Sequence, residues 1–330
     1  MEPILLATIF VSFFCTFLTI PFWIRKTKQI GLVWEDMNKP NHSKNIAGSG
    51  GLIVVFGFLL GVLLYIAIKT FYFKADGNIE GIFAILAVMF ISSIVGIVDD
   101  LFGWQKGGLS IRSRLILILF AAIPLMVINA GESSMMGIEL GLLYPLLVIP
   151  LGVVGATTTF NFLAGYNGLE AGQGILILSA LAVVTFLTGN SWLSIIALCM
   201  VASLIAFYIF NKFPAKVFPG DVMTYAIGTL IASIAIIGNI EKIAVFFFIP
   251  YILETILKLR GNLRKQSFGK VNEDGSLEIP YKKFYGLEHM AIYVLKKLKS
   301  NKKVYEKEVV YLIYGFQLVI ILLGFLLFLI

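Results

Sequence analysis

The sequence has little charge, two cysteines and only two histidines. Charged residues make up 14% of its 330 positions, whereas soluble domains carry roughly 25%, and 59% of the residues are hydrophobic. This balance excludes an ordinary soluble domain and indicates an integral membrane protein. Cys15 and Cys199 lie inside apolar runs, which argues against a disulfide framework or a cysteine metal site. His42 and His289 each lack a second metal-type residue at ligand spacing, so we interpret both as structural or solvated.

Long apolar runs dominate what the chain does contain. A membrane-crossing helix needs about 20 mainly apolar residues. The predicted spans are Pro3–Ile24, Gly48–Ile68, Gly81–Val98, Leu115–Ala130, Gly141–Phe160, Gly172–Leu187, Ser191–Phe210, Val222–Gly238, Ile243–Leu257 and Val309–Ile330. We therefore expect an all-α membrane protein, with residues 1–330 forming a single polytopic domain of ten transmembrane helices.

The placement of basic residues predicts the orientation of these spans. Of the 26 Lys and Arg residues, only Lys69, Lys74 and Lys242 fall in the loops on one side. Cytosolic loops carry the excess of Lys and Arg, so the opposite, basic side is predicted to be cytosolic and both termini to face out. The net charge of +7 thus indicates topology, and we expect no nucleic-acid partner.

A polar, glycine-rich stretch, Asn161–Gln173, lies between two apolar runs on the predicted cytosolic face. Polar groups at this depth are costly unless they line a cavity or bind something. Their amide oxygens could meet a hard cation or a sugar. The alternative is a plain helix-loop-helix turn in which Gly and Asn serve only the turn geometry.

Acidic and basic residues accompany that stretch on the same face. Asp99 and Asp100 are predicted to end the third span, where adjacent carboxylates are unfavourable at the negative end of a helix unless Mg²⁺ or a basic residue offsets them. The alternative is a solvated pair. Arg112 and Arg114 open the fourth span, where they either clamp a phosphate or simply anchor the helix by the positive-inside rule.

Asp221, in Phe218-Pro219-Gly220-Asp221, opens the eighth span and by itself could be only a helix N-cap. Together with Asp99, Asp100, Asn161 and Asn167, it makes a set of oxygen ligands from the cytosolic ends of different helices. Such a set suits Mg²⁺, which prefers one or two carboxylates, waters and substrate phosphates. An acidic Mg²⁺ pocket beside lipid predicts phosphoryl chemistry on a lipid substrate.

The last predicted cytosolic loop, residues 258–308, is the largest soluble part of the chain. Asp274-Gly275 predicts a small β-hairpin, and an apolar stripe from Leu287 to Leu298 ending in lysines predicts an interfacial amphipathic helix. Arg264 and Lys265 lie near the start of the loop, where they could reach a nucleotide diphosphate.

The motifs Asn161–Gln173, Asp99-Asp100 and Phe218–Asp221 resemble the polyprenyl-phosphate N-acetylhexosamine-1-phosphate transferase superfamily, also called glycosyltransferase family 4. The nearest group is the tunicamycin-sensitive dolichyl-phosphate N-acetylglucosamine phosphotransferases, in an archaeal-like form with a short final loop. The family transfers a sugar-1-phosphate from a UDP-sugar to a polyprenyl phosphate and releases UMP. The expected substrates are therefore UDP-GlcNAc and a polyprenyl or dolichyl phosphate, as the first membrane step of N-glycan-type assembly.

The resemblance also implies a role for each site residue. Asp99 and Asp100 would be catalytic, Asn161 and Asp221 would bind Mg²⁺ (or Mn²⁺ as a substitute), and Arg112 and Arg114 would hold the lipid phosphate. The donor UDP-sugar would contact Glu35, Asp36, Met37, Asn167, Arg264 and Lys265. Direct attack by the lipid phosphate and attack through a covalent aspartyl intermediate both remain open.

Two departures narrow the assignment. The His-rich motif of the bacterial peptidoglycan-precursor branch is missing, and Arg264-Lys265-Gln266 stands where the eukaryotic group has Arg-His-Arg. The alternatives are the same reaction with another UDP-N-acetylhexosamine for a surface polysaccharide, or a membrane transporter. The expected location is the cell membrane (the ER membrane in a eukaryote) with a cytosolic active site. A homodimer is one alternative for the assembly, which the sequence leaves open.

Overall fold

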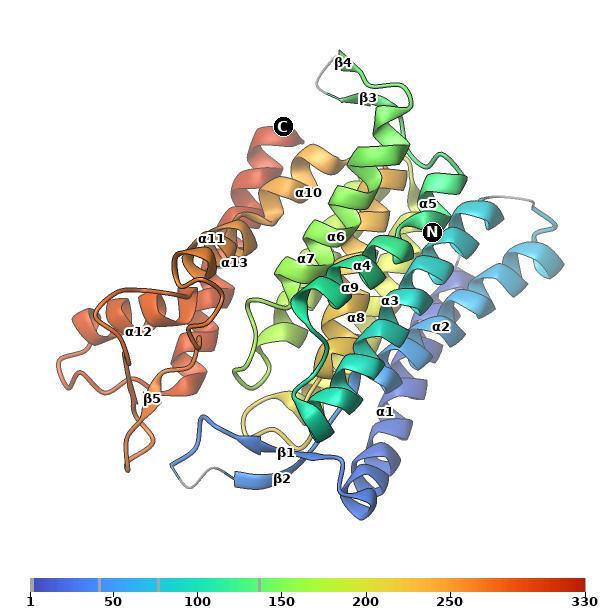
Figure 1. Ribbon diagram of the computed structural model, residues 1–330. Coiled ribbons are helices and arrows are strands. Elements are labelled where there is room, and N and C mark those ends of the chain that lie inside the picture. The colour runs from blue at the N-terminus through green and yellow to red at the C-terminus, as the bar shows by residue number, and fades with distance from the viewer. Residues whose placement is uncertain (1–2, 41–42, 76–77, 136–137, 330) are drawn as a thin grey trace.

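The fold is a bundle of apolar helices with short hairpins at its two ends (Figure 1). The structure, a computed structural model, describes residues 3–40, 43–75, 78–135 and 138–329, so His42 lies outside it. The main helices are α1 (Leu6–Ile30), α2 (Gly51–Ala67), α3 (Ile79–Lys106), α4 (Ile111–Ala121), α6 (Ile149–Phe160), α7 (Leu169–Leu187), α8 (Ser191–Asn211), α9 (Gly220–Ile237), α11 (Ile249–Arg260), α12 (Leu287–Leu298) and α13 (Glu306–Phe328). Shorter elements are η1 (Pro3–Leu5), η2 (Ile68–Tyr72), α5 (Ile123–Val127), η3 (Tyr144–Val148) and α10 (Glu241–Phe247). The strands are β1 (Val33–Asp36), β2 (Ser43–Ala47), β3 (Ser134–Met135), β4 (Ile138–Glu139), β5 (Lys270–Val271) and β6 (Leu277–Glu278), paired in sequence order as three antiparallel hairpins.

Among the described residues, seven helices are long and apolar enough to cross a membrane. Three predicted spans differ from these: Leu115–Ala130, Gly141–Phe160 and Ile243–Leu257. Leu115–Ala130 is divided into α4 and α5, and Ile243–Leu257 into α10 and α11, each with a proline just after the division, Pro124 or Pro250. Proline lacks the N–H that a continuous helix needs and clashes with the preceding turn, which accounts for these two breaks. In the third span, η3 and α6 form one apolar helix, Tyr144–Phe160, that is shorter than the seven full-length spans. The structure therefore supports a multi-pass, mainly α-helical membrane protein, while ten crossings stay a prediction.

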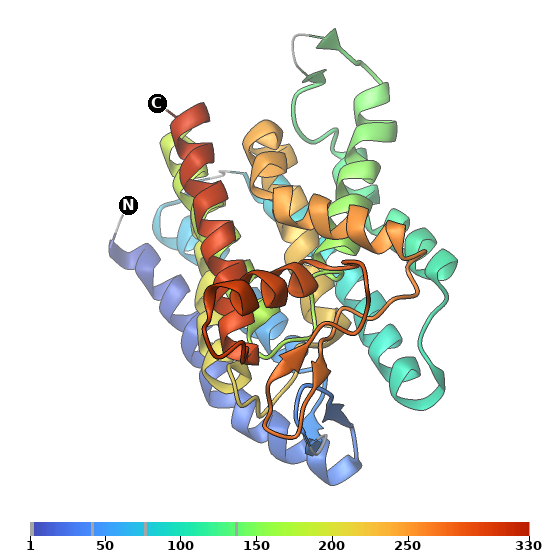
Figure 2. The ribbon, with the colours of Figure 1, turned by 90° about the vertical axis from the view of Figure 1, so that its left-hand side faces the viewer.

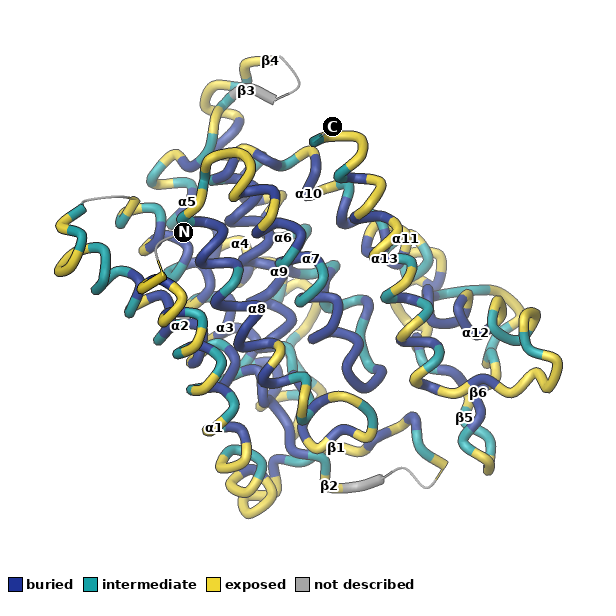
Figure 3. The backbone as a smooth tube through the Cα atoms, turned by 180° about the vertical axis from the view of Figure 1, so that it is seen from behind, coloured by how far each residue is buried: buried dark blue, intermediate teal, exposed yellow. Residues whose placement is uncertain are grey.

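Helix α1 shows how the sequence is arranged for lipid rather than water. Its large apolar side chains form an exposed stripe of Phe10, Phe14, Leu18 and Phe22. On the opposite face, the buried hydroxyls of Ser12 and Thr16 bond to carbonyls one turn earlier and pack against Gly57 and Gly61 of α2. Small residues at the contact allow two helices to approach closely in a membrane. Figure 3 shows the same gradient, with buried helices inside and exposed stripes on α1 and α13.

The most buried of the candidate spans is α9, with 83% of its apolar window inside the protein, compared with 28% for α1. It packs against α3 and α6, and α8 packs against α1 and α7. The start of α1 and the end of α13 lie toward the same end of the bundle (Figures 1 and 2). The strands β1, β2, β5 and β6 lie at the opposite end. That opposite end contains the polar residues of interest.

The loop before α13 contains a buried polar cluster beneath α12. The Glu254 carboxylate accepts a hydrogen bond from the Leu287 N–H at 2.6 Å, and Glu288 and His289 are fully buried beside it. Burial lowers the pKa of His289, whose Nδ1 accepts from the Tyr285 N–H at 3.2 Å, so the ring is neutral and structural. Burial, with the nearby carboxylate of Glu254, raises the pKa of Glu288 well above its ordinary value.

We expect the stability of this loop to fall as the pH rises. A carboxyl group whose pKa is raised on folding contributes fully below its unfolded pKa, and that contribution is lost as the pH rises through the folded pKa. Glu288→Gln removes the charge, so amide hydrogen exchange in α12 should match the wild type at pH 5 and be about tenfold slower at pH 8. Glu273→Gln, an exposed substitution in the β5–β6 turn, is the control. Equal exchange in Glu288→Gln and wild type at pH 8 would contradict this expectation.

Candidate functional site

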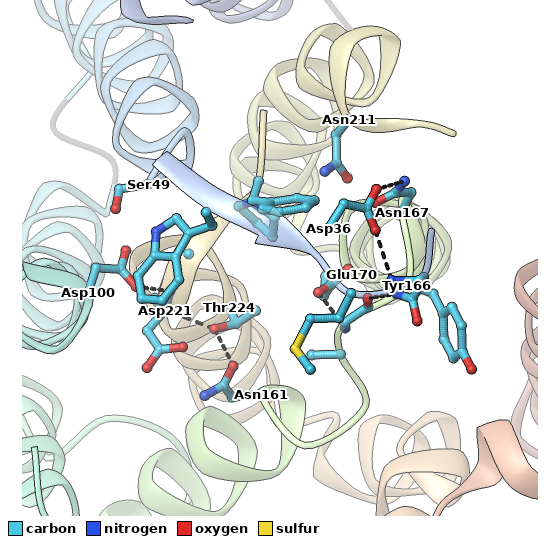
Figure 4. Close-up of a pocket in the computed structure, with 18 of the residues that line it drawn as sticks. Asp36, Ser49, Asp100, Asn161, Tyr166, Asn167, Glu170, Asn211, Asp221 and Thr224 are labelled. Carbon is cyan, nitrogen blue, oxygen red and sulfur yellow. Dashed lines mark hydrogen bonds between the residues drawn. The ribbon is translucent and has the colours of Figure 1, made fainter. Parts of the chain in front are cut away.

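A cavity of about 370 Å³ opens where β1, the α6–α7 loop and the start of α9 meet. Figure 4 labels ten residues of its polar lining, Asp36, Ser49, Asp100, Asn161, Tyr166, Asn167, Glu170, Asn211, Asp221 and Thr224. Glu35 and Asn38 also belong to the polar lining. Met37, Trp34, Phe218 and Phe268 contribute apolar surface. Segments far apart in the sequence therefore share one pocket at one end of the bundle.

The stretch Asn161–Gln173 contributes two of the predicted ligands. Asn161 caps the C-terminus of α6, and its Oδ1 accepts a hydrogen bond from the Thr224 hydroxyl of α9 at 3.0 Å. The sequence suggested that Glu170 lies in the loop. In the structure, helix α7 begins at Leu169, so Glu170 is a buried residue of the first turn of that helix. Its Oε1 accepts from the Gly165 N–H at 2.9 Å, which closes the loop on itself.

Asp221 lies in the first turn of α9, yet it does not cap the helix, because Pro219 holds the cap position and no side-chain cap bond forms. Its backbone N–H instead donates to Asp100 Oδ1 at 2.7 Å. This contact needs Gly220, whose φ is +70° and whose position would bring any Cβ against the Asp100 carboxylate. The N-cap alternative for Asp221 is therefore excluded.

The acidic pair differs from its prediction in position. Asp99 and Asp100 do not end a helix, because α3 continues to Lys106. Both residues therefore lie within the helix, which packs against α4 and α9, and the argument from the helix terminus does not apply. Gly96 lets α3 touch the backbone of Val222 in α9, and this close approach brings Asp100 to the pocket.

The two aspartates have different surroundings. Asp99 is held by Arg114, with Nε at 2.5 Å and Nη2 at 3.0 Å, by the Leu109 N–H at 2.7 Å and by the Tyr225 hydroxyl at 3.2 Å. Asp100 lines the cavity, and its buried Oδ2 receives no hydrogen bond from the described residues. Asp99 thus joins α3, α4 and α9, whereas Asp100 has an oxygen available for a ligand.

The basic residues are more dispersed than predicted. Arg114 is paired with Asp99, and Arg112 is exposed on the first turn of α4. Arg264 and Lys265 are exposed in the turn after α11, and Lys265 Nζ lies 5.1 Å from the centre of the Tyr281 ring. None of these four is among the described residues that line the cavity.

The acidic and amide groups of the cavity differ from a preformed metal site, yet they suit a divalent ion that also binds substrate. No group of three His, Cys, Asp or Glu among the described residues is arranged to hold a metal. The cavity does bring together the carboxylates of Asp100 and Asp221 with the amide of Asn161, and Asp100 Oδ2 is buried with no hydrogen-bond donor among the residues that the structure describes. Two carboxylates and an amide oxygen fit Mg²⁺, which takes its remaining ligands from water and substrate phosphate.

Comparison with known proteins shows the family to which the chain belongs. A family model described as "Glycosyl transferase family 4" matches residues 82–239, from α3 to α9. A protein of Saccharolobus solfataricus named putative UDP-N-acetylglucosamine–dolichyl-phosphate N-acetylglucosaminephosphotransferase is 34% identical over 95% of this chain and 93% of its own length. The chain belongs to glycosyl transferase family 4.

More distant members of this family are also similar to the chain. The UDP-N-acetylglucosamine–dolichyl-phosphate N-acetylglucosaminephosphotransferase of Dictyostelium discoideum is 29% identical over 72% of the chain and 67% of its own length. The phospho-N-acetylmuramoyl-pentapeptide-transferase of Streptococcus thermophilus is 29% identical over 74% of the chain and 75% of its own length. The resemblance seen in the motifs is therefore confirmed for the chain as a whole.

The family match covers the acidic pair, both arginines, both asparagines and Asp221, but neither β1 nor the loop before α13. Those two parts contribute Asn38, which belongs to the nucleotide-side segment that the resemblance implied, and two residues that sequence reasoning missed, Phe268 and Glu306. Asn38 donates from Nδ2 to the Gly165 carbonyl at 2.7 Å, and Phe268 lines the cavity beside Tyr166. Glu306, at the start of α13, accepts from the Asn167 N–H at 2.6 Å. Of the two missed residues, Glu306 gave a signal, as a carboxylate at the edge of an apolar span, and Phe268 gave none.

Proposed function

We propose that this family member transfers N-acetylglucosamine-1-phosphate from UDP-GlcNAc to a polyprenyl phosphate of the dolichyl type, as the first membrane step of glycan assembly. The products are polyprenyl-diphosphate-GlcNAc and UMP. The observation that carries the proposal is the convergence of Asp100, Asp221, Asn161 and Asn167 on one pocket at one end of the helix bundle. The named function of the Saccharolobus relative, 34% identical over 95% of the chain, supports it.

In the proposed reaction, an oxygen of the lipid phosphate attacks the phosphorus nearest the sugar. The bond from that phosphorus to the bridging oxygen breaks, and the oxygen leaves with UMP. A phosphate monoester is already an anion at neutral pH, so a strong base is unnecessary. The roles of the chain are to hold both phosphates in line and to offset their charge.

Each part of the pocket has a role in that reaction. Asp100 and Asp221, with the amide of Asn161, are the residues that would hold Mg²⁺, which when bound supplies positive charge at the pyrophosphate. Asn167 and residues 35–38, at the end of β1 and just after it, bind the donor. Arg114, which pairs with Asp99, keeps α4 against α3 so that Asp100 faces the cavity.

The same proposal places the pocket on the cytosolic face and the chain across the membrane ten times. Helix α1 begins and α13 ends toward the same end of the bundle, which requires an even number of crossings. Seven full-length spans are odd in number, so the three shorter or divided segments must add an odd number of crossings. Counting each as one crossing gives ten and keeps the basic loops on the side of the pocket.

The test is a membrane assay with radiolabelled UDP-GlcNAc, dolichyl phosphate and Mg²⁺. Label should enter the lipid extract with release of UMP, and tunicamycin should prevent it. Parallel reactions with other UDP-N-acetylhexosamines distinguish the alternative donor, because the preferred sugar is the one with the highest kcat/KM. If no UDP-sugar labels the lipid while a folded chain is present, the proposed function is wrong.

Removal of divalent ions should abolish the transfer. Several kcal/mol of charge stabilisation come from a metal at a phosphoryl site, so chelation should lower the rate by at least about a hundredfold. Mg²⁺ should restore the rate fully and Mn²⁺ in part. The measurement is lipid-linked label after treatment with EDTA and re-addition of each ion, and an unchanged rate in EDTA would contradict the metal assignment.

A further inference from the structure

Three charged side chains meet at the wall of the pocket, where Asp36 lines the cavity, and neither the motifs nor the comparisons account for this meeting. Lys39 Nζ lies 2.6 Å from Glu306 Oε2 and 3.2 Å from Asp36 Oδ2. Both carboxylates are buried, each with 3% of its surface exposed. Asp36 ends β1 and Glu306 begins α13, so this Asp36–Lys39–Glu306 triad joins the two segments that the family match does not cover.

Both acidic members of the triad also hold Asn167. Glu306 Oε1 accepts from its backbone N–H at 2.6 Å, and Asp36 Oδ2 accepts from its side-chain Nδ2 at 3.0 Å. The amide nitrogen of Asn167 is therefore committed to the triad. The amide oxygen, which is buried and receives no hydrogen bond from the described residues, is the atom left for a ligand. The triad thus fixes the orientation of the Asn167 side-chain amide, with its nitrogen toward the triad and its oxygen free for a ligand.

We propose that Lys39 and Glu306 are positioning residues for donor binding, acting through Asn167. This inference rests on the proposed function, in which Asn167 binds the UDP-sugar. Lys39 and Glu306 are not among the described residues that line the cavity, so their effect is exerted on the orientation of Asn167 and of the loop that carries it. One consequence is that donor affinity depends on a residue of the last membrane span.

The charges of the triad predict how its members differ. Lys39→Met leaves the buried carboxylates of Asp36 and Glu306 facing each other without a cation, so they repel and one of them releases Asn167. Glu306→Gln keeps an oxygen that can accept from the Asn167 N–H and removes only the charge that Lys39 pairs with. Lys39→Met should therefore disturb Asn167 more than Glu306→Gln does.

The experiment compares these variants with Lys307→Met in the purified full chain. Lys307 is exposed, and its Nζ lies over the same Phe213 ring as Lys39 Nζ, at 4.7 Å compared with 4.1 Å, which makes it a matched control. Lys39→Met should raise the KM for UDP-GlcNAc about tenfold or more and Glu306→Gln by less, with the KM for polyprenyl phosphate unchanged. Lys307→Met should stay within about twofold of the wild type.

The split between the two KM values separates positioning from a structural role. A variant that merely folds less well loses kcat in proportion to its folded fraction and keeps both KM values, and that result would overturn the inference. So would a donor KM within twofold of the wild type in Lys39→Met. If Lys39→Met does not fold, the double variant Lys39→Met/Glu306→Gln removes the repulsion and takes the same test. If the wild type transfers no sugar, the proposed function fails separately, and titration with UDP still decides the role of the triad.

Discussion

Asp221→Asn is expected to abolish transfer while leaving the chain folded. The carboxylate of Asp221 lies in the cavity close to Asp99 and Asp100, where it is one of the two acidic groups available to a phosphate-bound metal. Loss of that charge should lower the rate by roughly a thousandfold, which corresponds to several kcal/mol of transition-state stabilisation. The measurement is the rate of lipid-linked label formation by purified protein.

The stability of the same variant distinguishes loss of function from loss of fold. Because Asp221 adds a negative charge beside two others, its neutralisation should raise the free energy of unfolding by roughly 1 kcal/mol. Replacing a functional residue often increases the stability of the folded protein, because functional sites are selected for activity at a cost in stability. Glu273→Gln makes the same change of carboxylate to amide at an exposed turn and should alter neither quantity. Wild-type activity in the Asp221→Asn variant would defeat the metal assignment. Unfolding of the variant would show instead that Asp221 has a structural role.

The second large effect concerns the adjacent aspartates, which should respond in opposite ways to one substitution. Asp99→Asn breaks a buried pair and turns an amide N–H₂ toward the Arg114 guanidinium, so we expect a loss of roughly 3 kcal/mol of stability. Asp100→Asn leaves the Asp221 N–H an acceptor and removes the charge of a carboxylate whose Oδ2 receives no hydrogen bond within the described part of the chain. That variant should be at least as stable as the wild type and should lose about a hundredfold or more in rate.

This pair of variants tests the division of roles directly. Thermal unfolding in detergent reports the cost at Asp99, and the transfer rate per folded molecule reports the role of Asp100. Arg114→Met should reproduce the instability of Asp99→Asn, because each substitution leaves one member of the same ion pair without its partner. Equal stability and equal activity of the two aspartate variants would show that the pair acts as a unit, contrary to the geometry.

Several elements followed from local patterns alone. The turn at Asp274-Gly275 and the apolar stripe of α12 were predicted from the sequence, and the structure has β5–β6 and a helix at those places. The position of the spans followed from apolar length, because a chain in lipid must satisfy its backbone internally and forms helices wherever side chains are apolar. Where proline interrupts that pattern, local reasoning counted a span that the structure divides.

The pocket itself was predicted only in part. Asn161, Asn167, Asp100 and Asp221 were predicted from residue type and shared membrane face, and the structure places them around one cavity. Arg264 and Lys265 were predicted by resemblance to a basic motif and lie in an exposed turn outside the described lining of that cavity. A motif carries residue type, but the direction of a long side chain on a loop depends on what packs beside it.

The sequence by itself determined the membrane environment, the family and the end of the bundle where chemistry is expected. Only the tertiary structure decided that Asp99 turns toward Arg114 while Asp100 turns toward Asp221, and that Glu306 reaches Asn167. The physical reason is that neighbouring residues on a helix point about 100° apart. Which of them meets a partner depends on the helices packed against each face. Two of these contacts, Asp100 with Asp221 and Glu306 with Asn167, join residues more than a hundred positions apart in the chain.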